Sequence, residues 1–482
     1  MKFHFLLGCL LGILTFLQAQ SKPNLIIIQT DEHNFRTLGC YRDQLPEEQA
    51  YVWGKGVEVE TPNIDRIANE GAICMNYYGA SPVCTPSRAS FQTGLFPQNT
   101  GAWKNNLHMT PTLTTYAKVL QNNGYATSYV GKWHLDGNEK PGFAPSNKFG
   151  YSDNQYMFNG GHNPWFKVTE EGEHFPVNKN MYYKWKKEGR DMSNIHFTTD
   201  YLTDRSLEIL ERDKNIPFCL MLSIPDPHTP NIVEGKYKHL YDDMVFEKPI
   251  TMVENTEQRP SWGAPKNKNE AKDEIDQEYM RGYFGMVKCI DDNVGRILKF
   301  LEENKLDQNT IIIFTSDHGD MLFEHKRRNK SVPYETAARV PFVIRYPKKI
   351  KAGKVINAAY VTTDFGPTIL GIMNQKEIPN AEGYNAAATF LGKSKVVTDN
   401  RLTYYRTSGG GWIAGVTNRY KLVLSVKEKP WLFDLEKDPN EFFNVFNDPE
   451  YKEIATKMHS DLLKLMTEVK EPGLAKIQGD SK

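Results

Sequence analysis

Continuous apolar runs that end in polar residues recur along this chain. Three of them are "NLIIIQTDEHN" (24–34), "PFCLMLSIP" (217–225) and "TIIIFTSDHGD" (310–320), and the strand-like "ATSYVGKW" (126–133) belongs with them. An unbroken apolar run of this length is typical of a strand that is buried on both faces, as in a parallel sheet. Each run therefore predicts a core strand that opens into a polar loop at its carboxyl end.

Helical patterns alternate with these runs. Thr61-Pro62 and Gly71 supply the N-cap, the first-turn proline and the stop signal of one helix. Further helices are expected over 110–124, 198–215 and 274–304. Regular alternation of helices and strands predicts an α/β fold, with a large doubly wound mixed sheet flanked by helices.

The pattern changes at about Gly383. Short alternating segments such as "RLTYYRTSG" and "RYKLVLS" follow, and then a final helical stretch. Such segments indicate antiparallel strands. We expect a main domain over 21–381 and a smaller C-terminal α+β subdomain with an antiparallel sheet over 382–482.

The first residues have the form of a secretory signal. One lysine precedes an apolar run from Phe3 to Leu17, and small and polar residues follow it up to Gln20. This run is too short to cross a bilayer comfortably, and no other stretch approaches the ~20 apolar residues that a membrane helix needs. The sequence predicts a signal peptide over 1–20, export to the periplasm or the extracellular space, and no membrane span.

Charge removes one class of partner. The chain has 59 basic and 59 acidic side chains, so that no overall field attracts polyanions. We therefore expect no nucleic-acid partner.

The polar ends of the predicted strands indicate where a ligand binds. In doubly wound sheets, ligands gather outside the carboxyl ends of the strands. Four polar clusters stand there: Asp31 with Glu32, Lys132 with His134, Asp226 with His228, and Asp317 with His318.

Two of these clusters suggest a metal site. Asp31, Glu32 and Asp317 offer carboxylate oxygens, which a hard cation such as calcium or magnesium prefers, and His318 stands beside them. A plainer interpretation of "SDHG" is a turn in which the aspartate is an N-cap.

Cys84 stands among polar and turn residues in "SPVCTPSRASFQTG". The five cysteines that follow the signal have no C-x-x-C spacing, and Cys219 in an apolar run is best interpreted as a buried small hydrophobe. The segment predicts a helix with Thr85 as N-cap and Pro86 at the first position, so that Cys84 and Arg88 lie at its positive end. A thiolate nucleophile and an inert cysteine are the alternatives.

The segment "CTPSRASFQTG" closely resembles the signature of the type I sulfatases of the alkaline phosphatase superfamily. Other segments resemble that family in the same order, among them "TPNIDRIANEG", "GYATSYVGKWHLDG", "PDPHTP", "NKSVPYE" and "LFDLEKDPNE". The resemblance covers nearly the whole chain after the signal. It implies that 21–381 is a sulfatase catalytic domain, and that a maturation enzyme oxidises Cys84 to Cα-formylglycine (3-oxoalanine).

The resemblance also implies roles for individual residues. The hydrated aldehyde at Cys84, ionised by the metal and Arg88, would attack sulfur and leave a sulfo-enzyme intermediate, which His134 would help to resolve. Lys132 and Lys330 would bind sulfate oxygens, and His228 would protonate the departing alcohol. The implied metal ligands are Asp31, Glu32, Cys84, Asp317 and His318.

Two of these ligands depart from the commonest family pattern. Glu32 replaces an aspartate, and His318 replaces an asparagine. An imidazole ligand admits manganese or another divalent ion, but calcium remains our prediction.

The implied substrate is a sulfated carbohydrate, such as a glycosaminoglycan, mucin or algal glycan fragment, attacked in exo fashion. A long loop over 143–185, rich in glycine, asparagine and aromatic residues, offers His162, Trp165 and His174 as sugar contacts. An equally good interpretation is that the aromatic residues only pack the loop down, namely Tyr151, Tyr156, Phe158 and Trp165. The alternatives are a phosphonate or phosphate ester hydrolase of the same superfamily and a carbohydrate-binding protein without catalysis.

Overall fold

The computed structural model describes residues 22–169, 173–233, 235–253, 259–265, 273–394 and 400–479. The predicted signal peptide lies outside the described residues. Eight strands form one large sheet in the order β11-β2-β10-β9-β1-β8-β3-β4. Their bounds are β1 Asn24–Asp31, β2 Ala72–Tyr78, β3 Ala126–Lys132, β4 Met157–Phe158, β8 Phe218–Pro227, β9 Thr310–Ser316, β10 Phe342–Arg345 and β11 Lys354–Val361.

The large sheet is mixed, as predicted. β1 pairs in parallel with β8 and β9, and Ile26 faces Leu220 on one side and Ile312 on the other. β10 runs antiparallel to both of its neighbours, β9 and β2. The apolar runs of the sequence are therefore the central strands of the sheet. In β1 every residue is buried, as expected of a strand that is covered on both faces.

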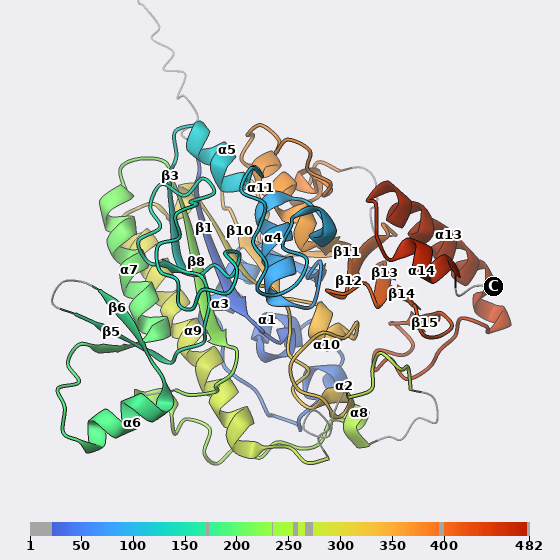
Figure 1. The fold of residues 1–482 in the computed structure, drawn as a ribbon, viewed down its shortest axis with the longest axis horizontal. Helices are drawn as coiled ribbons and strands as arrows, with labels where there is room; N and C mark the ends of the chain where they lie inside the picture. Colours follow the sequence, from blue (N-terminus) through green and yellow to red (C-terminus); the bar gives the residue numbers. More distant parts are fainter. Residues whose placement is uncertain are drawn as a thin grey trace, which may run out of the picture.

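Helices cover both faces of the sheet (Figure 1). Successive residues of β1 point to opposite faces, so Leu25 and Ile27 join one hydrophobic cluster and Ile26 and Ile28 join the other. The first cluster includes residues of α4, α5, α11 and α12, and the second includes residues of α3, α7 and α9. The helices are α1 Gly39–Arg42, α2 Glu47–Ala50, α3 Pro62–Asn69, α4 Cys84–Thr93, α5 Tyr116–Asn122, α7 Thr198–Asp213, α8 Ile250–Val253, α9 Gln277–Glu303, α10 Glu335–Ala338, α11 Phe365–Ile372 and α12 Ala387–Phe390.

Most predicted helices are confirmed, with one late start. Asp276 caps α9 by accepting a hydrogen bond from the amide of Tyr279. The helix expected from residue 110 begins only at Tyr116, because the side chain of Thr115 accepts a hydrogen bond from the amide of Lys118 and so caps α5 there.

The C-terminal part is the predicted α+β unit. Its four-stranded antiparallel sheet lies at the right of Figure 1 with two helices beside it. The elements are β12 Thr403–Arg406, β13 Trp412–Val416, β14 Tyr420–Ser425, β15 Trp431–Asp434, α13 Lys452–Glu468 and α14 Leu474–Gly479. The boundary at 382 stays a prediction; Phe390, beyond it, packs against Phe342 and Tyr360 of the main sheet.

The prediction of a long loop over 143–185 was wrong for part of its length. The segment holds β4, two strands of a small three-stranded sheet, and helix α6. Trp165 is fully buried and stacks on Tyr182 with ring centroids 4.0 Å apart, and His174 bonds to the hydroxyl of Tyr201. These two residues therefore pack the segment together. The elements are β5 Trp165–Val168, β6 His174–Val177, β7 Ile195–Phe197 and α6 Lys179–Lys187.

The described cysteines are all free and buried. Cys219 lies inside β8 and is 1% exposed, as its apolar surroundings predicted. None of the helices in the described part of the chain is both long enough and apolar enough to cross a bilayer.

Candidate active site

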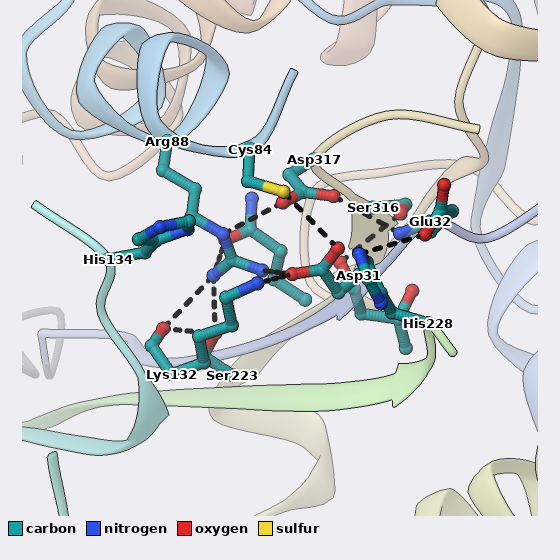
Figure 2. Close-up of polar contacts among 12 residues, drawn as sticks. Asp31, Glu32, Cys84, Arg88, Lys132, His134, Ser223, His228, Ser316 and Asp317 are labelled. Carbon is teal, nitrogen blue, oxygen red and sulfur yellow. Dashed lines mark hydrogen bonds and ion pairs between the residues drawn. The ribbon is translucent and has the colours of Figure 1, made fainter. Parts of the chain in front are cut away.

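The carboxyl ends of the central strands meet at one edge of the large sheet. Asp31 ends β1, Lys132 ends β3 and Asp317 follows β9. Because these strands run in the same direction, the three side chains lie at the same edge of the sheet. Helix α4 begins above this edge and brings Cys84 to it (Figure 2). The structure thus places side chains that are far apart in the sequence in one buried cluster.

Helix α4 begins earlier than the sequence predicted. Its N-cap is Val83, which makes no side-chain capping bond, and Cys84 is the first helical residue. Thr85 is not the cap, because its hydroxyl donates to the carbonyl of His134 at 2.9 Å. Pro86 therefore lies in the first turn, where a missing N–H costs nothing. Cys84 keeps its position at the positive end of the helix.

The thiol of Cys84 lies among charged groups. Its Sγ is 3.2 Å from Nε2 of His318, 3.2 Å from Nζ of Lys330 and 3.6 Å from Oδ1 of Asp31. Burial and Asp31 raise the pKa of Cys84, but Lys132 and Lys330 outweigh them, so the pKa lies well below its ordinary value.

Arg88 binds the two strand-end carboxylates from one turn into α4. Its Nε donates to Asp317 at 2.8 Å, and its Nη2 donates to Asp31 at 3.1 Å. Its Nη1 donates to the carbonyl of Lys132 at 3.0 Å and to the hydroxyl of Ser223 at 2.7 Å. A guanidinium with this many fixed acceptors holds β1, β3, β8 and the loop after β9 in one arrangement.

Lys132 also binds Asp31, through an ion pair between two side chains with no exposure. Burial raises the pKa of Asp31, but Lys132, His162 and Arg88 outweigh it and hold the pKa well below its ordinary value. Asp31 is therefore a carboxylate, ready to coordinate a cation.

Four side chains form a group suited to a metal ion. Asp31, Cys84, Asp317 and His318 each offer one ligand atom, and these atoms lie within 4.8 Å of one another. Nδ1 of His318 lies 2.9 Å from the carbonyl of Gly319, a contact that requires a proton on Nδ1. Nε2 faces the group, and a cation bound there would take its lone pair in place of a proton.

Glu32, the fifth predicted ligand, lies beside this group. Its Oε2 is 3.1 Å from Nε2 of His228 and 3.5 Å from Nζ of Lys330. Its Oε1 is buried and has no hydrogen-bond partner in the described part of the chain. Burial raises the pKa of Glu32 to about 8, although Lys330 acts against this. An unpartnered buried carboxylate oxygen is the feature that a cation would satisfy.

The two remaining predicted histidines approach the cluster from different loops. Nδ1 of His228 lies 2.8 Å from the carbonyl of Thr229 and donates a hydrogen bond to it. Burial, then Lys330 and His162, lower the pKa of His228 well below its ordinary value. Neither ring nitrogen of His134 has a hydrogen-bond partner among the described residues, and burial and Lys132 lower its pKa.

Sequence reasoning missed some members of the cluster. Ser223 and Gln29 both contact Arg88; Ser223 interrupts the apolar run of β8, and Gln29 is the first polar residue after the apolar run of β1. That interruption was the available signal. His162 stacks on His228 with centroids 3.5 Å apart, and its Nε2 lies 2.7 Å from Nζ of Lys132. Its role as a sugar contact stays a prediction.

Comparison with known proteins decides the family. Residues 23–375 match the family model described as Sulfatase, which is most of the chain. The chain belongs to the sulfatase family. Residues 323–468 also match the model described as N-sulphoglucosamine sulphohydrolase, C-terminal. The resemblance inferred from the Cys84 segment is confirmed, and the protein is a sulfuric ester hydrolase.

Sulfatases of known name cover nearly the whole chain. An N-acetylglucosamine-6-O-sulfatase from Bacteroides thetaiotaomicron is 27% identical over 93% of this chain and 86% of its own length. An ulvan-active sulfatase from Formosa agariphila is also 27% identical, over 93% of this chain and 82% of its own.

Solved structures share the sulfatase fold. A protein solved in complex with its substrate D-glucosamine-2-N,6-O-disulfate has a TM-score of 0.75 and 25% identity, and covers 94% of this chain and 99% of its own. The phosphonate monoester hydrolase of Agrobacterium radiobacter has a TM-score of 0.67 and 19% identity, and covers 93% of this chain and 96% of its own. The second similarity concerns the fold alone.

Membership of the sulfatase family implies a formylglycine and a divalent metal, and the residues of this chain fit both. Cys84 begins α4 in the sulfatase signature, and three other potential ligands surround its Sγ. The donor set joins carboxylate oxygens to one imidazole, which suits a hard or borderline divalent cation.

Proposed function

We propose that this protein is an exported sulfatase that hydrolyses sulfate esters of carbohydrates, exo-acting, through a formylglycine at Cys84. The observation that carries the proposal is the position of Cys84, which lies in the first turn of α4 within reach of His318, Asp31 and Lys330. Two relatives are named as an N-acetylglucosamine-6-O-sulfatase and an ulvan-active sulfatase, and these names support a sugar substrate.

The site supplies positive charge where a sulfate ester would develop negative charge. Once oxidised, position 84 would supply a hydrated aldehyde, one hydroxyl of which would attack sulfur while the S–O bond to the sugar alcohol breaks. Loss of a proton from the second hydroxyl would then break the C–O bond to the sulfate and restore the aldehyde. The ammonium group of Lys330 lies 3.2 Å from Sγ of Cys84, and that of Lys132 pairs with Asp31, whose Oδ1 is 3.6 Å from the same Sγ. Both ammonium groups would bind sulfate oxygens. Fixed cations in a buried site stabilise such charge strongly, because they need no reorganisation.

Two histidines are placed for proton transfer. Because Nδ1 of His228 donates to the carbonyl of Thr229, Nε2 is the atom that faces the departing alcohol oxygen. It would protonate that oxygen only as the imidazolium, which the lowered pKa makes a strong acid. The two unpartnered nitrogens of His134 leave that ring free to accept a proton from the hydrate. Asp31, Asp317, His318 and the nearby Glu32 would hold the divalent cation, which we propose is calcium.

Mass spectrometry of the matured protein tests the first step. The peptide that contains position 84 is expected to have lost mass relative to the cysteine peptide, because an aldehyde replaces the thiol. Cys84→Ala is expected to abolish sulfate release and keep the fold, whereas Cys219→Ala, at another buried cysteine, is expected to keep turnover. An intact thiol in protein that is active on its natural ester would contradict the mechanism.

Four measurements test the rest of the proposal. Sulfate release from sulfated monosaccharides and disaccharides would identify the sugar, and the products formed from longer oligosaccharides would separate exo from endo action. Turnover of phosphodiesters faster than sulfate esters would favour the phosphonate or phosphate hydrolase instead. Detection of the chain outside the cytoplasm without residues 1–20 would establish export.

A further inference from the structure

A cleft of about 630 Å³ opens beside the proposed catalytic position. Val83, next to Cys84, and Ser331, next to Lys330, form the end nearest to the site. Two hydrogen bonds fix this end to the start of α4: the amide of Ser331 donates to the carbonyl of Pro82 at 3.0 Å, and that of Thr85 donates to Asn105 at 3.0 Å. The volume lies in the range of ordinary ligand pockets.

The far wall of the cleft comes from the C-terminal sheet and from residues 261–264. Residues 407–412 contribute the turn before β13, and Ser425 and Lys427 contribute the end of β14. Figure 1 shows this sheet beside α4. A substrate held at Cys84 could therefore extend from the main domain onto the C-terminal part.

The charge of this cleft is one-sided. Lys104 and Lys427 line it, and no carboxylate does so among the residues that the structure describes. Within the same residues neither ammonium group has an ion-pair partner; that of Lys104 lies 5.0 Å from the ring centre of Trp103. The carboxylate of Glu428, next to Lys427 in the sequence, accepts hydrogen bonds from Ser261 and Trp431 instead.

Unused hydrogen-bonding groups also face this region. Nε1 of Trp262 and the hydroxyl of Ser408 are buried, and the structure gives neither a partner within its described ranges. Both residues line the cleft. Trp262 and Trp412 add aromatic surface of the kind that sugar rings contact.

We propose that this cleft binds the leaving sugar of the substrate and selects one that carries a second anionic group, a sulfate or a carboxylate, through Lys104 and Lys427. The inference rests on the proposed carbohydrate sulfatase function and extends it to a class of substrates. Lys104 and Lys427 line the cleft from different parts of the chain, and their charges favour an anion over a neutral sugar. Trp262 and Trp412 offer aromatic surface on which the sugar ring can lie.

A binding experiment tests the cleft apart from catalysis. The full-length Cys84→Ala protein cannot turn its ligand over, so calorimetry can compare glucosamine 6-sulfate with glucosamine-2-N,6-O-disulfate. A second comparison uses N-acetylglucosamine 6-sulfate alone and joined to glucuronic acid. We expect at least one doubly anionic ligand to bind more tightly than its singly anionic partner. The pair with the larger difference in affinity shows whether the cleft prefers a sulfate or a carboxylate as the second anionic group.

The lysines provide the decisive variants. Lys104→Gln with Lys427→Gln is expected to weaken the favoured doubly anionic ligand about tenfold more than its singly anionic partner, since each charge-assisted contact is lost. Lys429→Gln removes an exposed lysine outside the cleft and serves as the matched control, with wild-type affinities expected.

Three results would overturn the cleft proposal: no preference for a second anionic group, equal weakening of both ligands in the double variant, or unchanged affinities in it. The sulfatase proposal is tested separately by turnover of 4-nitrophenyl sulfate, which has no sugar, in the matured wild-type protein. If that turnover is absent but the preference for the doubly anionic ligand remains, the sulfatase function is contradicted and the cleft proposal is still supported.

Discussion

Arg88 shows how much of the site depends on one side chain. It is 2% exposed and donates to carboxylates that follow two different strands. The sequence places it one turn into a helix, but only the fold brings Asp31 and Asp317 to it. Its charge compensates the two buried carboxylates, which would otherwise repel each other. The same pattern, a buried cation between groups from distant segments, recurs at Lys132 and Lys330.

His228→Ala tests the acid role at the scale of one residue. We expect turnover of sugar sulfates, whose alcohol is a poor leaving group, to fall about 100-fold or more, because proton transfer contributes at least this factor. Turnover of activated aryl sulfates is expected to fall much less, because such leaving groups need no proton. Kinetics on the two substrate types measure the difference, and equal losses would remove the acid role.

At the scale of elements, the strand ends position the site. Lys132 ends β3, and Gly131 just before it has φ of 101°, a conformation that side chains rarely adopt. A Cβ at Gly131 would lie 1.9 Å from the carbonyl oxygen of Ser223 on the neighbouring strand β8. This close approach keeps Lys132 and Ser223 against Arg88.

Gly131→Ala is expected to destabilise the fold by more than about 3 kcal/mol, because both the backbone conformation and the contact between β3 and β8 must change. Sulfate turnover should fall with it, since Lys132 moves. Gly189→Ala is the control: its φ is also positive, at 68°, but nothing lies within 4 Å of the added carbon. Urea unfolding that gives equal losses for the two variants would refute this account.

At the scale of the whole molecule, a buried ion cluster joins the two parts of the chain. Lys421 of β14 is unexposed and donates to Glu335 at 2.8 Å and to the carbonyl of Pro333 at 3.0 Å. It also pairs with Glu441 at 2.6 Å. Pro333 and Glu335 follow Lys330 closely, so the C-terminal sheet supports the segment that carries a proposed sulfate ligand.

Lys421→Met removes the cation between the buried carboxylates of Glu335 and Glu441, and leaves Arg339, at 3.8 Å from Glu335, as the nearest ion-pair partner of that residue. We expect a loss of about 3 to 5 kcal/mol in the free energy of unfolding, and weaker binding of sulfate esters through displacement of Lys330. Lys457→Met, which breaks an exposed pair with Asp461 on α13, should leave both nearly unchanged. Urea titration and the KM for 4-nitrophenyl sulfate measure the two effects. Wild-type values in Lys421→Met would contradict the link.

We expect His325 to make the free energy of unfolding depend on pH. Its ring stacks on Tyr334 with centroids 3.8 Å apart, and burial, then Arg259 and Lys421, lower its pKa from 6.5 to about 3. The folded protein keeps this histidine neutral while the unfolded chain binds a proton below pH 6.5. Its contribution to stability is therefore present above pH 6.5 and is lost as the pH falls towards 3.

The loss attributable to His325 between pH 7 and pH 5 is about 2 kcal/mol. His325→Phe keeps the stacked ring without the titration, so urea unfolding should depend less on pH across that interval. Between pH 7 and pH 9 the variant and the wild type are expected to have the same slope. Equal slopes below pH 6.5 as well would show that this histidine does not titrate as described.

Local sequence pattern decided much of this protein. The apolar runs specify buried strands because a strand covered on both faces has no polar positions, and their acidic ends specify where a ligand lies. The segment around Cys84 specifies the chemistry, since a helix start with cysteine, proline and arginine is a local signal. The tertiary structure alone decided the start of α4 at Cys84, the stacking of His162 on His228, and the strands within 143–185. These depend on contacts between distant segments, such as Thr85 with His134, which no local pattern contains.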